Sequence, residues 1–307
     1  MATRIPYLDE TWSPVTGCGD DMVSPGCLNC YARRMFGRNL WKCPECDGTG
    51  QIDVSGILYD QRDTMECPRC DATGHQAFTP TFHSDRLDQP LHWRKPRRIG
   101  VSFMGDLFHE AITDEQRDAV LARIIGSPQH TFMLLTKRAE AARTYLSDQH
   151  ERCAMLLANW HHLVPDGRNP WPLPNVHLGV TVCNQEEADR NIPLLLDTPA
   201  AVRWVSLEPM LGPVDLRRGV YQMPPDGAAR GTTLEGLDLV ILGGETGPGA
   251  WPMQPEWALD VYRQCKAAGV PFWFKSMGSA PHKKVWDWPN TLGAEMQATH
   301  ELPVVRP

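Results

Sequence analysis

Short runs rich in β-branched and aromatic residues alternate along this chain with amphipathic stretches of helical periodicity. The helical stretches are residues 113–128, 184–199 and 255–269, bounded by residues typical of helix ends, such as Thr113 and Gly269. This alternation predicts an α/β fold with a mostly parallel sheet. The six predicted strands are RRIGVSFMGD (97–106), HTFMLLTKR (130–138), NVHLGVTV (175–182), AVRWVSLEP (201–209), LDLVILGGE (237–245) and VPFWFK (270–275).

The beginning of the chain fits this pattern less well. A weak strand signal at residues 4–14 leads into a loop rich in glycine and proline, and residues 28–41 then have a helical pattern. A chain of 307 residues has room for one large domain or two small ones, and both α/β barrels and doubly wound sheets fit this length.

Composition and charge exclude several classes of protein. Hydrophobic residues make up 42% of the chain, and no apolar run approaches the roughly 18 residues that cross a bilayer. Because no secretory signal is recognisable, we expect a soluble cytoplasmic protein, in the host cytoplasm if a phage encodes it. Ten cysteines in a reducing compartment then suggest metal binding rather than disulfides.

The net charge of −7 argues against a uniformly basic surface for nucleic acid. Two local basic runs, residues 31–38 and 92–98, are consistent with solvated faces and equally with phosphate contacts. Tyr31, Trp41 and Trp93 lie in or near these runs, and their rings are suited to stacking on bases.

Polar residues follow nearly every predicted strand. Because the carboxyl ends of parallel strands converge on one face of an α/β fold, repeated polar residues there predict the rim of an active site. A strand that simply ends in a polar loop is the alternative at any one position. The residues concerned are Asp106, Thr136, Lys137, Thr181, Glu208 and Glu245.

Four cysteines form a C-x2-C pair, a spacer of twenty residues and a second C-x2-C pair. They are Cys43, Cys46, Cys67 and Cys70. This spacing predicts a structural zinc site in an insertion spanning residues 41–78, with a second iron–sulfur cluster as the minor alternative. The two halves resemble the cysteine-rich zinc module of DnaJ-type chaperones, although Ala72 stands where that repeat has glycine. This short resemblance supports a zinc hairpin and not a chaperone function.

Three further cysteines, Cys18, Cys27 and Cys30, lie together in the glycine- and proline-rich loop. Thiolates hold cubane iron–sulfur clusters, usually four to a cluster, so three would leave one iron open to a small molecule. The alternative is a second zinc ion completed by His83 or His109, in a non-enzymatic nucleic-acid adaptor. The scattered Cys153, Cys183 and Cys265 are explained by free buried thiols.

With these cysteines, the chain resembles the radical S-adenosylmethionine superfamily, and in particular a three-cysteine subgroup common in phages and mobile elements. The segments that carry this resemblance are TWSPVTGC, SPGCLNCYA, FMGDLFHE, LGVTVCNQEEAD, VRWVSLEPMLGPVDL, VILGGETGPGAWPM and AAGVPFWFK. The chain departs from the superfamily in having eight residues rather than three between its first two cysteines. It departs from the subgroup at Trp251, where arginine is expected, and at Cys183, where an acidic residue is expected.

The resemblance implies a partial TIM-like (β/α)6 barrel formed by residues 1–40 and 79–278, with a C-terminal extension at 279–307. It also implies a [4Fe-4S] cluster on Cys18, Cys27 and Cys30, and S-adenosylmethionine bound at the open iron. Gly105 and Asp106 would then meet the amino group of the cofactor, a contact that suits a carboxylate.

Further roles follow from the same resemblance. Thr181 and Asn184 would contact the ribose or carboxylate of the cofactor, and Tyr31 would lie against its adenine. Glu208, Glu245 and Lys275 would face the substrate as catalytic residues, or staple neighbouring strand ends as salt bridges.

The implied chemistry is cleavage of S-adenosylmethionine to a 5'-deoxyadenosyl radical, which needs an electron donor such as flavodoxin or ferredoxin. The favoured substrate is a nucleobase in phage DNA, as in thymidine hypermodification, and tRNA modification is the alternative within the same chemistry. A base in a duplex would have to be flipped outward to reach the cluster.

Overall fold

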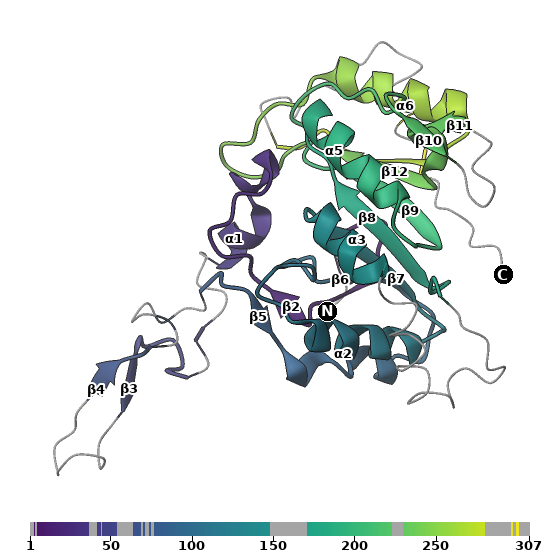
Figure 1. Ribbon diagram of the computed structural model, residues 1–307. Helices are drawn as coiled ribbons and strands as arrows, with labels where there is room; N and C mark the ends of the chain where they lie inside the picture. The colour runs from purple at the N-terminus through teal and green to yellow at the C-terminus, as the bar shows by residue number, and fades with distance from the viewer. Residues whose placement is uncertain are drawn as a thin grey trace.

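A single parallel sheet of seven strands organises the protein, and it curls into a half-barrel (Figure 1). The computed structural model describes residues 3, 5–36, 42–43, 45–53, 64–68, 70, 74, 77–147, 171–222, 230–279, 296 and 299–300. In spatial order the strands are β1 (Glu10–Trp12), β6 (Arg98–Val101), β7 (Thr131–Thr136), β8 (Val176–Thr181), β9 (Val202–Leu207), β12 (Leu239–Gly243) and β13 (Phe272–Ser276).

The predicted α/β class and parallel sheet are confirmed, and the curled sheet is consistent with a partial barrel. All six predicted strands form, and the weak signal at residues 4–14 adds β1 as a seventh strand, paired with β6. The sheet therefore contains one strand more than the six βα units that were expected.

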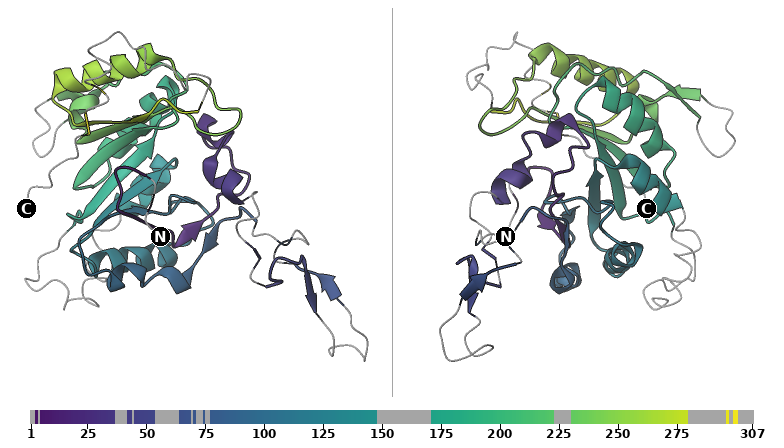
Figure 2. Two further views of the ribbon diagram at one scale, coloured as in Figure 1. Left: turned by 180° about the vertical axis from the view of Figure 1, so that it is seen from behind. Right: turned by 60° about the vertical axis from the view of Figure 1, so that its left-hand side comes forward.

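Helices cover the convex face of the sheet (Figures 1 and 2). The main ones are α2 (Asp114–Ile125), α3 (Ala139–Ser147), α5 (Gln185–Leu196) and α6 (Pro255–Ala268). Thr113 and Gln116 form a capping box at the start of α2, and Gly269 ends α6 with a φ of 67°. These are the ends that the sequence predicts. No described helix has the length and apolar character needed to span a membrane.

One crossover differs from the regular alternation. Between β9 and β12, the described residues form no α-helix, only the antiparallel pair β10 (Val220–Gln222) and β11 (Arg230–Thr232) and a short 3-10 turn at Leu234–Gly236. This turn still contributes to the core, since Leu234 is fully buried beneath the sheet.

Residues of the strands alternate between two cores. In β7, Phe132 and Leu134 pack under the helices, whereas Met133 points to the concave side. There it joins Trp204, Leu239, Ile241 and Trp273, together with Tyr7 and Leu8 from the N-terminal segment. The amino end of the concave face is thus filled by apolar side chains.

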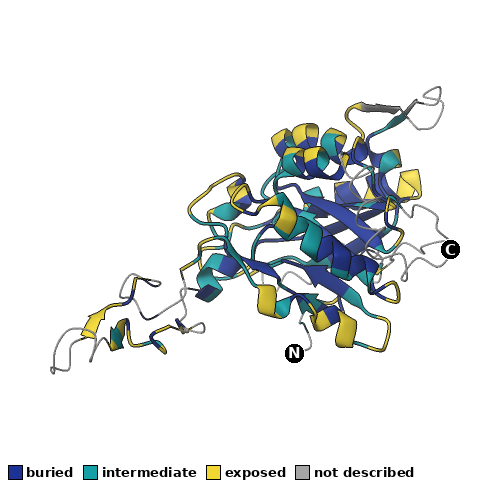
Figure 3. Ribbon diagram, turned by 60° about the horizontal axis from the view of Figure 1, so that its bottom comes forward, coloured by how far each residue is buried: buried dark blue, intermediate teal, exposed yellow. Residues whose placement is uncertain are grey.

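A small arm projects from the body of the protein (Figures 1 and 3). It contains the antiparallel pair β3 (Gln51–Asp53) and β4 (Thr64–Glu66), within the predicted insertion at 41–78. A second small pair, β2 (Val15–Thr16) with β5 (Thr81–Phe82), lies where the arm leaves the body. Trp41, much of the insertion and most of the predicted extension at 279–307 lie outside the described residues, so these domain boundaries stay predictions.

The packing of Trp204 over Gly179 provides a test of the concave core. A Cβ atom at position 179 would lie 2.3 Å from the Trp204 ring, so Gly179→Ala forces two neighbouring strands to shift. We expect a loss of about 1–3 kcal/mol in the free energy of unfolding, measured by urea denaturation.

Gly212→Ala is the matched control for this variant, because a Cβ there meets only ordinary contact at 3.8 Å. It should leave stability within about 0.5 kcal/mol of wild type. Equal stability of the two variants would contradict the packing described here.

Candidate active site and metal centre

A cavity of about 310 Å³ opens at the carboxyl ends of the strands. It is lined by the cysteine loop, by helix α1 (Tyr31–Phe36) and by residues at the ends of β6 through β13. The predicted site residues that line it are Cys18, Cys27, Cys30, Tyr31, Gly105, Asp106, Thr181, Glu208, Glu245 and Lys275. Segments far apart in the sequence therefore meet at one place, as expected for the carboxyl edge of a parallel sheet.

Glycines hold the cysteine loop close to the sheet. A Cβ atom on Gly17 would lie 2.1 Å from the carbonyl oxygen of Thr79, and Gly17 has a φ of 77°. A Cβ on Gly26 would lie 2.8 Å from Sγ of Cys183. Larger residues at these positions would clash with these neighbours and displace the loop.

Cys18, Cys27 and Cys30 are free, half-buried thiols. Among the described residues, the only group of three or more potential ligands that lie within 4.8 Å of one another is the other cysteine set, in the arm. The three loop sulfurs are therefore not gathered closely enough for one tetrahedral zinc ion, whose sulfur ligands would be about 3.8 Å apart.

The two histidines considered as fourth ligands have other partners. His83 contacts the hydroxyl of Thr16 at 2.8 Å through Nε2. His109 accepts from the backbone N–H of Ala111 at Nδ1, so its Nε2 carries the proton that faces Asp21 at 3.0 Å. Neither histidine belongs to a close group with the loop cysteines.

Asp106 is buried and ties the end of β6 to the end of β7. Its carboxylate accepts hydrogen bonds from the backbone N–H of Phe108 (3.0 Å) and Lys137 (3.1 Å), the hydroxyl of Thr136 (2.8 Å) and the guanidinium of Arg138 (3.4 Å). The carboxylate thus already accepts from four donors within the protein. Its contact with the amino group of a cofactor stays a prediction.

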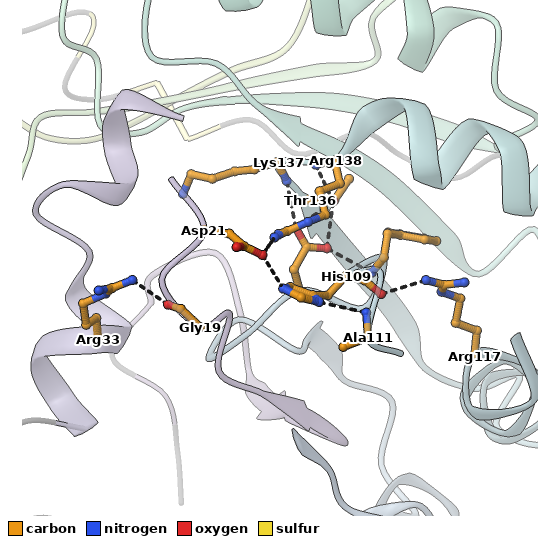
Figure 4. A network of polar contacts seen from close by, with 11 residues as sticks. Gly19, Asp21, Arg33, His109, Ala111, Arg117, Thr136, Lys137 and Arg138 are labelled. Atoms are coloured by element: carbon orange, nitrogen blue, oxygen red, sulfur yellow. Dashed lines mark hydrogen bonds and ion pairs between the residues drawn. The ribbon is translucent and has the colours of Figure 1, made fainter. Parts of the chain in front are cut away.

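A polar network links Asp106 to the cysteine loop through Arg138, and Figure 4 shows Arg138 beside Asp21 of this loop. Asp21 of the loop contacts Arg138 at 3.3 Å and His109 at 3.0 Å, so Arg138 joins both aspartates. Lys137 extends from the end of β7 toward the same loop (Figure 4). Burial alone would lower the pKa of Lys137, but negative charge on the thiolate forms of Cys27, Cys183 and Cys30 and on the carboxylate of Asp106 raises it, so Lys137 stays a cation beside the cysteines.

Glu208 and Lys275 form an ion pair above the intervening strand β12. Gly243 of β12 leaves room for it, since a Cβ there would meet the side chain of Glu208 at 3.4 Å and that of Lys275 at 3.5 Å. Glu245 is buried and accepts from the backbone N–H of Trp251 at 2.8 Å. Glu208 and Lys275 therefore form the salt bridge between strand ends that was the alternative to a catalytic role. Both residues also line the cavity, and about one-fifth of each side chain is exposed.

The remaining predicted cofactor residues are in different situations. Tyr31 lines the cavity, and its hydroxyl donates to the carbonyl of Phe103. Thr181 is buried and lines the cavity. Asn184 does not line it; instead its side-chain oxygen caps α5 by accepting from the backbone N–H of Glu187 at 3.0 Å.

Several residues of this site were not predicted from the sequence. Tyr7 and Ser206 line the cavity, as do Arg138 and Asp21. The sequence could have indicated Ser206, because it lies two residues before Glu208 in the predicted strand 201–209, and residues two apart in a strand face the same side of the sheet. Tyr7 carried no such signal, since it precedes the first strand.

The arm contains a cysteine set whose geometry fits zinc. Cys43 and Cys67 have their sulfurs 3.8 Å apart, and those of Cys46 and Cys70 are 3.7 Å apart. All four are buried, and these separations match the roughly 3.8 Å expected around a tetrahedral ion with 2.3 Å zinc–sulfur bonds. Burial opposes ionisation of Cys46, but hydrogen bonds from the backbone of Gly50 and Gly48 lower its pKa to about 6. These residues could therefore bind a metal such as zinc.

Comparison with known proteins places the chain in a family. A family model described as a protein of unknown function, DUF5131, matches residues 2–301. The chain belongs to the DUF5131 family. No curated protein and no solved structure matches it.

The metal site of this DUF5131 protein can be tested by its zinc content. Purified protein should contain one zinc ion per chain, and Cys43→Ser should lose it, because three thiolates bind zinc far more weakly than four. Metal analysis by mass spectrometry measures both. Cys265→Ala removes an equally buried thiol elsewhere and should retain the zinc; full zinc content in Cys43→Ser would refute the assignment.

Because the Asp106 carboxylate accepts hydrogen bonds from four donors, replacing it by a neutral amide should lower the stability of the folded protein strongly. In Asp106→Asn, an amide N–H would face one of these donors and Arg138 would lose a counter-charge. We expect the free energy of unfolding to fall by about 2–4 kcal/mol, measured by urea denaturation.

Asp20→Asn is the control for this variant, because the Asp20 side chain is fully exposed in its contact with Arg33. It should cost less than about 1 kcal/mol. If Asp106→Asn lowered the free energy of unfolding no more than Asp20→Asn does, the proposed contribution of Asp106 to stability would be wrong.

Proposed function

We propose that this DUF5131 protein is a radical S-adenosylmethionine enzyme with a [4Fe-4S] cluster on Cys18, Cys27 and Cys30. The observation that carries the proposal is the position of three free thiols on one cavity at the carboxyl ends of a parallel half-barrel. When bound, the reduced cluster would transfer one electron to the sulfonium of the cofactor, giving methionine and a 5'-deoxyadenosyl radical that removes a hydrogen atom from the substrate.

Cysteines must lose their protons to bind a cluster, and the surroundings of Cys18 oppose this loss as long as no iron is bound. Burial, followed by the nearby charge of Asp106, raises the pKa of Cys18 to about 12, so its thiol stays protonated until iron displaces the proton. Cluster assembly should therefore release protons and be favoured by higher pH. Lys137 supplies a compensating positive charge on the same cavity.

A second zinc site in a non-enzymatic adaptor is the competing function. It is less well supported, because the loop sulfurs form no close group and His83 and His109 are engaged elsewhere. The cavity is a further argument against it, since a structural zinc site is closed by four protein ligands and needs no adjoining space.

The favoured substrate class is a nucleobase in phage-type DNA, with thymidine hypermodification as the leading reaction and tRNA modification as the alternative. The two basic runs give this less support than expected. Arg33 and Arg34 bind carbonyl and side-chain oxygens within the protein, and the run at 92–98 precedes β6, at the end of the sheet opposite the cavity. A flavodoxin or ferredoxin as electron donor is part of the same proposal.

Anaerobic reconstitution tests the proposed cluster. Wild-type protein should turn brown, absorb near ~400 nm and bind about four irons per chain, as expected for a thiolate-bound cubane. The triple variant Cys18→Ala, Cys27→Ala, Cys30→Ala should bind no iron yet keep its zinc, and Cys265→Ala should bind both metals. Colourless wild-type protein with two zinc ions would favour the adaptor instead.

Formation of 5'-deoxyadenosine tests the activity. With dithionite as reductant, the reconstituted protein should cleave S-adenosylmethionine, and modified phage-type DNA should accelerate this more than free nucleosides do. Chromatography of the products measures both. An absence of stimulation by any polynucleotide would count against a nucleic-acid substrate.

A further inference from the structure

The lining of the cavity includes a hydroxyl group that has no hydrogen-bond partner among the described residues. Ser206 is 1% exposed and lines the cavity, and its Oγ atom is buried without such a partner in the part of the chain that the structure describes. A buried hydroxyl without a partner costs free energy, so such a group at a cavity wall is suited to a ligand atom. Ser206 pairs in register with Thr181 of β8, which lines the same cavity.

A second residue with a hydroxyl group, Tyr7 of the N-terminal segment, also lines the cavity. Tyr7 is 2% exposed, and its ring packs edge-on against Trp204 and Trp273, with centroid separations of 6.4 and 6.1 Å. None of the described residues makes a hydrogen bond with its hydroxyl. Burial raises the pKa of Tyr7 well above its usual value, and Glu208 and Tyr31 raise it further, so this phenol stays neutral.

The ion pair of Glu208 and Lys275 completes the group. Glu208 faces the same side of β9 as Ser206, two residues away, and both members of the pair line the cavity. The pair offers a carboxylate acceptor beside ammonium donors with no net charge. Such a pair suits a neutral ligand, because a phosphate or carboxylate would be repelled by Glu208 and an ammonium by Lys275.

We propose that Ser206, Tyr7, Glu208 and Lys275 form a recognition subsite for a neutral edge of alternating C=O and N–H groups, as on the imide of a pyrimidine base. Glu208 accepts from the ring N–H, Lys275 donates to a flanking carbonyl, and the two hydroxyls bind the remaining polar atoms. This inference rests on the proposed function, and it assigns the hydrogen-bonding edge by which the substrate is held.

A pair of probes tests the subsite without any mutation. The first is a single-stranded octamer of thymidine, and the second is the same octamer with every thymine methylated at N3, which removes the imide N–H. Affinity is measured by fluorescence anisotropy with the anaerobically reconstituted protein and S-adenosylmethionine. Both probes have the same phosphates, so a difference in affinity reports on the base. Because the methylated octamer lacks the N–H that Glu208 would accept, wild-type protein should bind it at least about tenfold more weakly.

Two variants assign the effect to the subsite. Ser206→Ala and Tyr7→Phe each remove one hydroxyl, and each should weaken binding of the unmethylated octamer by about three- to tenfold. Both should leave binding of the methylated octamer and the iron content nearly unchanged. Ser127→Ala is the control, because the buried hydroxyl of Ser127 also has no hydrogen-bond partner among the residues that the structure describes, but Ser127 lies before β7, at the opposite end of the sheet.

The outcomes separate this inference from the proposed function. Equal affinity of wild-type protein for the two octamers, or no binding of either, would overturn the subsite even if the protein contained four irons and produced 5'-deoxyadenosine. Conversely, protein without an iron cluster that still discriminated between the octamers would overturn the radical enzyme and retain the subsite. Ser206→Ala and Tyr7→Phe variants that bind both octamers like wild type would overturn the assigned residues.

Discussion

A curled parallel sheet has a concave face that its own crossover helices cannot cover, and the structure depends on how that face is filled. At the amino ends of the strands it is packed with Trp204, Trp273, Met133 and the N-terminal Tyr7. At the carboxyl ends the inward side chains become polar and a cavity remains. Because inward positions recur every second residue, β9 contributes Trp204 to the packing and Ser206 to the cavity, and Glu208, directly after the strand, also lines the cavity.

The cavity also needs a wall on its open side, and the cysteine loop supplies it. This loop has little secondary structure, so it is held by the close approach of Gly17 to the backbone of Thr79, by that of Gly26 to the side chain of Cys183, and by the polar contacts of Asp21 with Arg138 and His109. Arg138 in turn contacts Asp106, which braces two strand ends. Asp106, which the sequence resemblance assigns to cofactor binding, therefore also connects the strand ends to the cysteine loop.

The arm and the cavity contain the two cysteine sets, and their geometries differ. A mononuclear tetrahedral site needs sulfurs that lie less than about 4 Å from their neighbours, and the sulfur pairs of the arm meet this requirement. The loop cysteines are spread along a cavity wall beside Lys137, where a larger anionic group would fit. In the proposed enzyme, the arm is therefore structural, and the loop is the reactive centre.

The sequence alone determined the strands, the helix ends at Thr113 and Gly269, and the zinc-type spacing of four cysteines, because each depends on residues close together in the chain. It also indicated which strand ends are polar. Only the tertiary structure decided that Glu208 pairs with Lys275 and that Tyr7 lines the cavity. Each of these depends on which segments become neighbours when the sheet curls, and local sequence contains no record of that.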